Sequence, residues 1–281
     1  MRERNLAAWS TDKEILMQSS SGGLFSEFAN KMMAEGGYVV GVKMDVDSLK
    51  TEYSISNDPC VVKKMRGSKY APSSPKNILP LLRSWDANIP VLVTGLPCHI
   101  EAIKKQCDTS NMILVDIRCH GLPRAGVFED HIRNIAGNRK IQAIRFRDKI
   151  GGWENGPISQ TLIIEFENGD VYDKYDEYIV GYLENTDMLR TQCQTCRKHH
   201  VGDITIGDFW GVPRKKYNLF GTSVVDINTK KGSDFYWSIP TIETHKVHFY
   251  DRLYPDYIGW FVVLKIWKVL QTAKRKGWIK R

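Results

Sequence analysis

Val91-Leu92-Val93-Thr94-Gly95-Leu96-Pro97-Cys98-His99 is the stretch that decides the fold. Its apolar run is typical of a buried strand, and Gly95 and Pro97 mark the turn that ends it. A second apolar run, residues 113–117, is followed by a Gly/Pro-containing turn that carries Cys119. Such runs alternate with helical patterns, which predicts strands paired in parallel. We therefore expect an α/β fold with a mixed, largely parallel sheet core and flanking helices.

Two cysteines follow these strands, and two more lie in the segment Cys193-Gln194-Thr195-Cys196. The carboxyl ends of parallel strands meet at one edge of a sheet, so two turns can bring Cys98 and Cys119 together. A Cys-x-x-Cys pair places two thiolates on one turn, at a spacing that suits a single metal centre. The predicted four-sulfur metal site consists of Cys98, Cys119, Cys193 and Cys196.

The ligand set alone leaves two kinds of metal centre open. Four cysteines bind an iron–sulfur cluster, but they also form a tetrahedral zinc site, which would describe a non-enzymatic metal protein. Iron and acid-labile sulfide distinguish the first alternative from the second. Cys60 and Cys107 lie outside the motifs, and we interpret both as ordinary thiols.

Whole-chain composition limits the class of protein. The 281 residues are 42% hydrophobic and 26% charged, which is an ordinary globular composition. Neither a signal peptide nor an apolar run of about 18 residues is recognisable, so we expect a cytoplasmic protein in which paired cysteines serve metal or redox chemistry. A net charge of +8 fits either a scattered basic surface that keeps the protein soluble, or attraction to a phosphate-bearing cofactor, an acidic protein or anionic lipid. The spacing of nucleic-acid-binding modules is missing, which argues against a nucleic-acid partner.

Two short motifs in the first quarter of the chain are candidate anion sites. Ser19-Ser20-Ser21-Gly22-Gly23 precedes a helical pattern, and small residues before a helix N-terminus leave backbone N–H groups for an anion. An ordinary capped helix is the simpler interpretation of this motif alone. In Arg66–Tyr70, a Lys between Ser and Tyr suits contact with a phosphate and stacking on a flat ring. A solvated loop is the alternative.

The order of seven segments resembles the beta-subunit family of coenzyme F420 hydrogenases and dehydrogenases, over about residues 15 to 230. The resemblance implies an oxidoreductase that relays electrons between a 4Fe–4S cluster and FAD, and from there to coenzyme F420 or another hydride acceptor or organic substrate. The matching segments are Ser19–Phe25, Gly67–Tyr70, Gly95–His99, Cys119–Pro123, Phe146–Trp153, Cys193–Cys196 and Asp203–Gly211.

The resemblance also assigns roles to individual residues. It supports the cluster ligands Cys98, Cys119, Cys193 and Cys196. It implies flavin or phosphate contacts from Ser20, Ser21, Gly22, Gly23, Ser68, Lys69 and Tyr70. We add His120 and Asp208 as candidate catalytic residues, because each adjoins these motifs and can hydrogen-bond near the cluster or move a proton. A loop histidine and a capping aspartate are the alternatives.

Many bacterial members of the family carry an N-terminal ferredoxin-like domain, which this sequence lacks. We therefore expect a separate ferredoxin-like donor or other redox subunit as partner. Shortened relatives accompany surface-polysaccharide enzymes, so an accessory role in polysaccharide biosynthesis is an alternative function.

Three regions follow from the motif positions. We expect an N-terminal lobe with the flavin-side motifs at residues 1–75, an α/β lobe with the four cysteines at residues 76–250, and a basic amphipathic helix at residues 251–281. In the last region, Trp260 and Trp267 share one helical face, while lysines cluster on another. Such a helix is typical of peripheral contact with a membrane surface or with an acidic partner, although it can also pack on its own domain.

Overall fold

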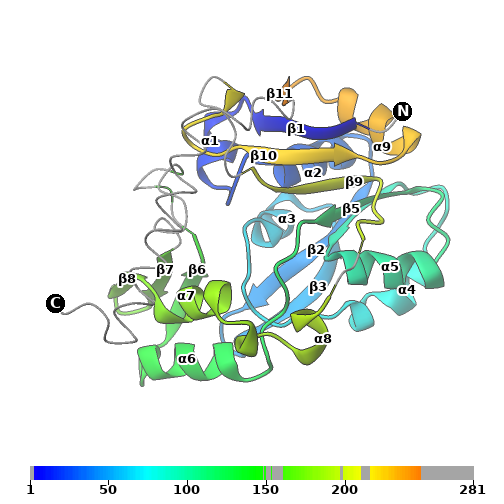
Figure 1. Cartoon of the computed structure of the whole chain (residues 1–281). Coiled ribbons are helices and arrows are strands. Elements are labelled where there is room, and N and C mark those ends of the chain that lie inside the picture. Colours follow the sequence, from blue (N-terminus) through cyan, green and yellow to red (C-terminus); the bar gives the residue numbers. More distant parts are fainter. Residues whose placement is uncertain are drawn as a thin grey trace.

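The computed structural model describes residues 3–147, 149, 153, 161–196, 199–209 and 216–247. Its largest element is an eight-stranded sheet in the order β11-β1-β10-β9-β5-β4-β2-β3 (Figure 1). Pairs β2–β4, β4–β5 and β5–β9 are parallel, whereas the other four pairs are antiparallel. The expected mixed α/β fold is confirmed, with its parallel strands at the centre. The strands are β1 (Glu3–Ser10), β2 (Tyr38–Asp45), β3 (Lys50–Ser56), β4 (Val91–Gly95), β5 (Met112–Ile117), β9 (Ile204–Asp208), β10 (Ser223–Ile227) and β11 (Ile242–Lys246).

Helices cover both faces of this sheet. Helices α2, α3 and α9 pack on one face, where the core includes Phe28, Leu92 and Phe235. Helices α4 and α5 pack on the other face, against Val91 and Val93. Because β4 is covered on both sides, its sequence is continuously apolar. The helices of this layer are α1 (Lys13–Met17), α2 (Leu24–Ala34), α3 (Pro59–Met65), α4 (Leu79–Arg83), α5 (Pro97–Gln106) and α9 (Lys230–Trp237), with a short 3-10 turn at Pro75–Asn77.

A smaller three-stranded sheet lies beside the large one. Its order is β6-β7-β8, and the predicted Asn168-Gly169 turn joins β7 to β8. Helices α6 and α7 pack against it through Phe128, Ile132 and Ile179. The elements of this layer are β6 (Ile141–Arg145), β7 (Thr161–Phe166), β8 (Val171–Tyr175), α6 (Val127–Ala136) and α7 (Glu177–Glu184), followed by the 3-10 turn Thr186–Met188 and by α8 (Thr191–Gln194).

Two local expectations differ from the structure. The sequence between residues 42 and 64 suggests strands and loops, but Pro59–Met65 is helical because Asp58 accepts a hydrogen bond from Cys60 N and Pro59 occupies the first turn. The sequence predicts that Ser223–Asn228 is the last core strand, but β11 follows it and pairs with β1. Its alternating exposure is that of an edge strand, which carries a weak apolar signal.

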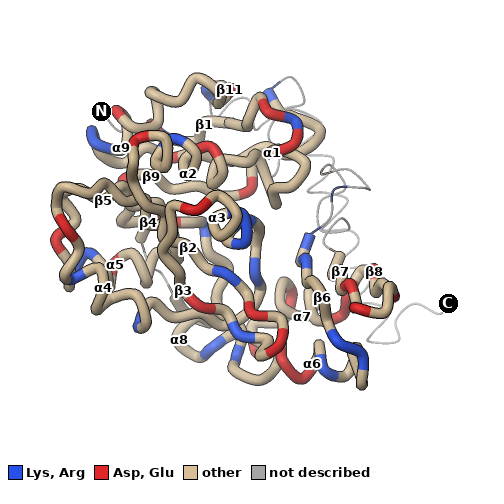
Figure 2. Tube along the Cα trace, turned by 180° about the vertical axis from the view of Figure 1, so that it is seen from behind, with Lys and Arg blue, Asp and Glu red and all other residues tan. Residues whose placement is uncertain are grey.

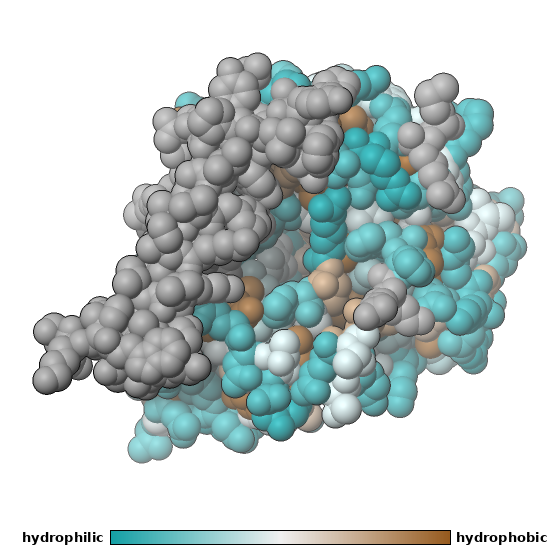
Figure 3. Space-filling view, in the orientation of Figure 1, coloured by the Kyte–Doolittle hydropathy of each residue, from teal (hydrophilic) through white to brown (hydrophobic). Residues whose placement is uncertain are grey.

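The surface in the orientation of Figure 3 is mainly hydrophilic, with apolar residues scattered among polar ones. Figure 2 shows basic residues on α3, among them Lys63 and Lys64. Within the described residues, no helix is long and apolar enough to cross a membrane. Both expected lobes contribute strands to the large sheet, and their boundaries stay a prediction. The expected amphipathic helix at residues 251–281 lies outside the described residues.

Candidate functional site

The carboxyl ends of β4 and β5 place two cysteines at the same edge of the sheet. Gly95 of β4 is the register partner of Asp116 of β5. Cys98 follows Gly95 by three residues, and Cys119 follows Asp116 by three residues. Parallel pairing of β4 with β5 therefore brings the two turns together. Cys98 lies in the first turn of α5, whereas Cys119 lies in the loop after β5.

The Cys-x-x-Cys segment reaches this edge through a short antiparallel contact. Arg190 N donates to the carbonyl oxygen of Leu122 at 2.9 Å, and a β-bridge joins Pro123 to Leu189. Helix α8, which carries Cys193, begins directly after this bridge, and the backbone N–H of Leu122 donates to Cys193 Sγ at 3.4 Å. The bridge therefore sets the position of the Cys-x-x-Cys turn.

Gly121 is required at this contact. Its φ of +139° is disfavoured for residues with a side chain, and a Cβ there would lie 3.2 Å from Cys193 Cβ. The loop after β5 can thus approach α8 closely only with glycine at this position.

The four predicted ligands lie close enough for their thiols to interact electrostatically. Desolvation by the surrounding protein raises the pKa of Cys119 to about 11, although the residue is exposed, and the neighbouring thiols of Cys98, Cys193 and Cys196 add to the rise. Burial and the same neighbours raise the pKa of Cys98. In the described part of the chain, no three His, Cys, Asp or Glu side chains are arranged to hold a metal ion. The ligand set therefore stays a prediction that the convergence of three segments supports.

Asp116 holds the chain that follows the Cys-x-x-Cys pair. Its buried carboxylate accepts hydrogen bonds from Val201 N (2.6 Å), Gly202 N (2.9 Å) and Thr205 Oγ1 (2.6 Å), and His200 Nδ1 lies 3.1 Å away. One carboxylate at the end of β5 thus connects the edge carrying Cys119 with the start of β9.

The segment Ser19–Gly23 and the segment Gly67–Tyr70 contact each other. Ser68 N donates to Ser20 Oγ at 2.8 Å, which joins the two motifs. Ser21 Oγ donates to the carbonyl oxygen of Thr222 at 2.9 Å, and Gly22 N donates to Ser223 Oγ at 3.0 Å. The N–H of Gly22 is therefore engaged within the protein, contrary to the expectation that it is open to an anion.

Gly23 ends this motif and serves as the N-cap residue of α2. Its φ is +84°, a left-handed conformation that favours glycine. The motif thus enters α2 through a turn that a residue with a side chain would strain.

Lys69 binds backbone carbonyls at the end of α3. Its Nζ donates to the carbonyl oxygens of Met65 (3.0 Å), Arg66 (2.9 Å) and Gly67 (3.2 Å), and burial of the ammonium lowers its pKa to about 7. A cation at a helix C-terminus stabilises the exposed carbonyls. The structure thus gives Lys69 a capping role that occupies its three N–H donors, and the cofactor contact of Lys69 stays a prediction.

Two basic residues that sequence reasoning did not select lie beside these motifs. Arg147, whose side chain is 5% exposed, forms an ion pair with Asp208 at 2.8 Å. Lys149 Nζ donates to the carbonyl oxygens of Leu16 and Ser21, both at 2.6 Å. Burial and the nearby Arg147 lower the pKa of Lys149 to about 7, while Asp208 opposes the shift. The signal for both residues was their place in the matching segment Phe146–Trp153.

Tyr70 lies next to the same charges. Burial raises its pKa, Arg147 opposes that rise and Asp208 adds to it. Arg147 in turn has a raised pKa, because the charges of Asp208 and Tyr70 outweigh the effect of its own burial. We call Ser20, Ser21, Ser68, Tyr70, Arg147, Lys149 and Asp208 the flavin-side cluster.

Tyr182 of α7 connects the flavin-side cluster with the cysteines. Its ring centroid lies 5.0 Å from that of Tyr70, and its hydroxyl donates to the carbonyl oxygen of Gly121 at 2.7 Å. His120 Nε2 donates to the carbonyl oxygen of Tyr182 at 3.0 Å, and the two rings form an edge contact at 5.1 Å. No motif marked Tyr182 in the sequence. The predicted catalytic residues thus lie apart, with His120 near the cysteines and Asp208 in the flavin-side cluster.

A further buried pair lies beside Cys98. The hydroxyl of Tyr53 and Nδ1 of His99 lie 2.9 Å apart, and burial lowers the pKa of His99 to about 4. His99 directly follows a predicted ligand, so it helps to position the first turn of α5. The sequence shows that His99 follows Cys98, but it does not indicate that Tyr53 is the hydrogen-bonding partner of His99.

Two family matches divide the chain. Residues 5–79 match the N-terminal part of the coenzyme F420 hydrogenase/dehydrogenase beta subunit, and residues 90–247 match the C terminus of that subunit. Among solved structures, a chain of the F420-reducing NiFe hydrogenase complex from Methanosarcina barkeri shares the fold. The alignment covers 97% of this chain and 91% of that chain, with a TM-score of 0.61 and 19% identity. The search of curated proteins gave no match.

Proposed function

This chain belongs to the coenzyme F420 hydrogenase/dehydrogenase beta subunit family, and from this premise we propose that it is a flavin-dependent iron–sulfur oxidoreductase. It relays electrons between a 4Fe–4S cluster and FAD, and passes them to coenzyme F420 or to another hydride acceptor or organic substrate. The observation that carries the proposal is the convergence of three cysteine-bearing segments at one sheet edge, next to a cationic cluster that Tyr182 connects to it.

The donor set at the sheet edge fits an iron–sulfur cluster. The turn after β4, the turn after β5 and the segment Cys193–Cys196 supply four free thiols. Soft thiolate ligands select iron–sulfur clusters and zinc over hard cations. When bound, the cluster supplies one electron at a low potential. The role of the protein would be to bring the thiols together, and the Gly95–Asp116 register and the Pro123–Leu189 bridge support this role.

The flavin-side cluster fits an anionic cofactor. Arg147 lies beside Tyr70, Lys149 contacts the carbonyl oxygen of Ser21, and the N-terminus of α2 begins at the same loop. When bound, FAD supplies both one-electron and hydride chemistry. Asp208 holds the guanidinium of Arg147, and Lys149 holds the carbonyl oxygen of Ser21, so the walls of the cluster are set by contacts within the protein.

Reconstitution tests the proposal directly. Anaerobically purified full-length protein should take up iron, acid-labile sulfide and FAD, with about four irons and four sulfides per chain. Protein that stays colourless after reconstitution, with neither iron nor flavin, would contradict the proposal. About one zinc per chain without sulfide would instead support a non-enzymatic four-cysteine zinc protein, or an accessory factor in polysaccharide biosynthesis.

The partners follow from the same proposal. A cluster at a sheet edge with exposed Cys98, Cys119 and Cys196 suits docking of a ferredoxin-like donor or another redox subunit. We also propose that residues 257–280 form a basic helix that docks on an anionic membrane surface or an acidic partner, on the pattern of Trp and Lys in the sequence. Truncation after Pro255 should abolish binding to anionic vesicles at low salt and leave a protein that still binds its cofactors. An insoluble truncation, together with full-length protein that ignores vesicles, would contradict this docking.

A further inference from the structure

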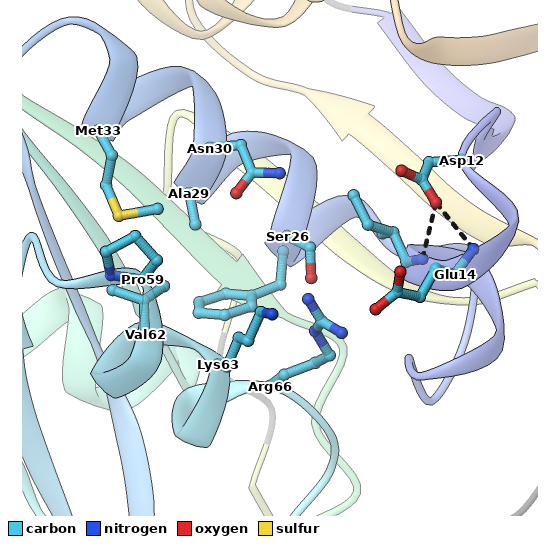
Figure 4. Close-up of a pocket in the computed structure, with 12 residues that line it drawn as sticks. Asp12, Glu14, Ser26, Ala29, Asn30, Met33, Pro59, Val62, Lys63 and Arg66 are labelled. Atoms are coloured by element: carbon cyan, nitrogen blue, oxygen red, sulfur yellow. Dashed lines mark hydrogen bonds between the residues drawn. The ribbon is translucent and has the colours of Figure 1, made fainter.

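A pocket lies between α1, α2 and α3, and none of the predicted cofactor residues lines it (Figure 4). Its volume is about 220 Å³, below the roughly 300–1,000 Å³ of sites for drug-sized ligands, so it suits a small molecule. Its floor is apolar, and its walls carry charges of both signs. Residues from three helices line the pocket: Phe25, Ser26, Ala29 and Met33 of α2, Val62 and Arg66 at α3, and Asp12 and Glu14 at α1.

Two buried polar atoms face this pocket without a partner in the described structure. Ser26 is 3% exposed, and its Oγ makes no hydrogen bond. The Nε of Arg66 is likewise buried without a hydrogen-bond acceptor, although its NH1 donates to Gln18 Oε1. Figure 4 shows the two side chains pointing toward one another from α2 and from the end of α3. A buried donor without a partner is costly, and one acceptor oxygen between them would satisfy both.

The position of Ser26 adds a second attraction for a negative group. It is the third residue of the eleven-residue helix α2, so the positive end of the helix dipole lies beside its hydroxyl. The guanidinium of Arg66 lies opposite and carries a full positive charge. An oxyanion between Ser26 and Arg66 would therefore accept two hydrogen bonds in a partly desolvated, positive environment.

The remaining walls decide which anion fits. Asp12 and Glu14 line the same pocket, and their charges disfavour a ligand with two negative charges. The carboxylate of Asp12 is already occupied by the backbone N–H groups of Glu14 and Ile15. Phe25, Ala29 and Val62 offer an apolar floor for a hydrocarbon or ring. A singly charged carboxylate with an apolar body matches all three features.

We propose that this pocket is a binding site for a small organic carboxylate, whose carboxylate group lies between Ser26 Oγ and Arg66 Nε and whose apolar part lies on Phe25, Ala29 and Val62. The site is separate from the flavin-side cluster. Among the described residues, none that lines the pocket belongs to the flavin-side cluster, although Lys69 Nζ donates to the carbonyl oxygen of Arg66.

Phenylacetate is a suitable probe for the full-length protein. Its binding, followed by ligand-observed NMR and by titration calorimetry, should exceed that of phenyl phosphate, which carries a second charge, and that of phenylacetamide, which carries none. Equal binding of the amide, or no binding of phenylacetate, would overturn the proposal. Tighter binding of phenyl phosphate would overturn the choice of a carboxylate.

Ser26→Ala separates binding from folding. The substitution removes an unpartnered hydroxyl and raises helix propensity, so the free protein should unfold at the same or a higher temperature. Affinity for phenylacetate should nevertheless fall about tenfold, the loss of one hydrogen bond to a charged group. A lower unfolding temperature would show that the hydroxyl has a structural role, and unchanged affinity would show that it does not touch the ligand.

Arg66→Lys tests the second contact, because lysine keeps the charge but lacks Nε. Its affinity for phenylacetate should also fall about tenfold. Lys63→Gln, at the exposed rim of the same pocket, is the matched control and should change affinity less than threefold. Flavin content should be unchanged in Ser26→Ala. Loss of flavin there would mean that the pocket belongs to the cofactor site, which would overturn the proposal without affecting the proposed function.

Discussion

The cysteine site and the flavin-side cluster are built from different kinds of contact. Around the cysteines, backbone pairing sets the positions, and Cys98, Cys119 and Cys196 remain exposed thiols. In the flavin-side cluster, Arg147 and Lys149 are buried and already hydrogen-bonded within the protein. The first region is positioned mainly by backbone contacts, whereas the second is also held by contacts of buried side chains. We therefore expect substitution of a cysteine to reduce cofactor content, and substitution in the flavin-side cluster to reduce stability.

The largest effect should come from Cys119→Ser. A hydroxyl is a poor substitute for a thiolate ligand, so we expect nearly complete loss of iron and sulfide after anaerobic reconstitution, with little change in the folded content of the protein. Chemical analysis of iron and sulfide, with circular dichroism, measures both. Cys60→Ser and Cys107→Ser are the controls and should retain full cluster content. Loss in either control would show that the ligand set is wrongly assigned.

Asp208→Asn should instead act on stability. It removes the carboxylate that faces the buried guanidinium of Arg147, and breaking such a pair costs about 3 kcal/mol of the free energy of unfolding. The matched control is Glu165→Gln, which breaks the exposed Arg145–Glu165 pair and should cost less than about 1 kcal/mol. Urea unfolding measures both values. Equal losses of unfolding free energy would show that the Arg147–Asp208 pair stabilises the fold no more than the exposed Arg145–Glu165 pair does.

The pH dependence of stability sharpens the same distinction. Lys149 has a folded pKa of about 7, below the value of about 10.4 for an unfolded lysine, so the folded state loses its proton first. Wild type should therefore gain stability relative to Lys149→Gln as the pH rises from 7 to 10, by at most about 1.4 kcal/mol per pH unit. Urea unfolding of both proteins at several pH values gives this difference. A flat difference would show that Lys149 stays charged throughout.

The smallest effect on folding should come from His120→Ala. His120 is exposed and donates one hydrogen bond, so its removal should cost no more than about 1 kcal/mol. If His120 acts near the proposed iron–sulfur cluster, its substitution should shift the midpoint potential of that cluster and the turnover of the protein, while iron content stays normal. Redox titration checks this. Normal midpoint potential and turnover in both His120→Ala and Asp208→Asn would show that neither residue takes part in the chemistry.

Local sequence patterns were sufficient for the main elements. The apolar run Val91–Val93, the helix signals after Gly23 and the Asn168-Gly169 turn were each readable, because strand, cap and turn preferences act within a few residues. Helix α3 and strand β11 carry weak local signals, because both are short, α3 is mostly exposed and β11 is mostly half-buried. The four cysteines were predicted from the Cys-x-x-Cys spacing and from the turns after two strands, and the order of the motifs along the chain supported them together with the two flavin-side motifs.

The partners of these residues were decided by the tertiary structure. Arg147 meets Asp208 across 61 residues, and Ser21 meets Thr222 across 201. Tyr182, which lies in an unremarkable helix, connects the cluster to the cysteines only because α7 packs beside the loop after β5. Such contacts depend on strand order and register, and a local pattern carries no information about which distant segment will lie beside it. The sequence by itself determined the types of residue available for the chemistry, whereas the sheet order decided which of them stand together.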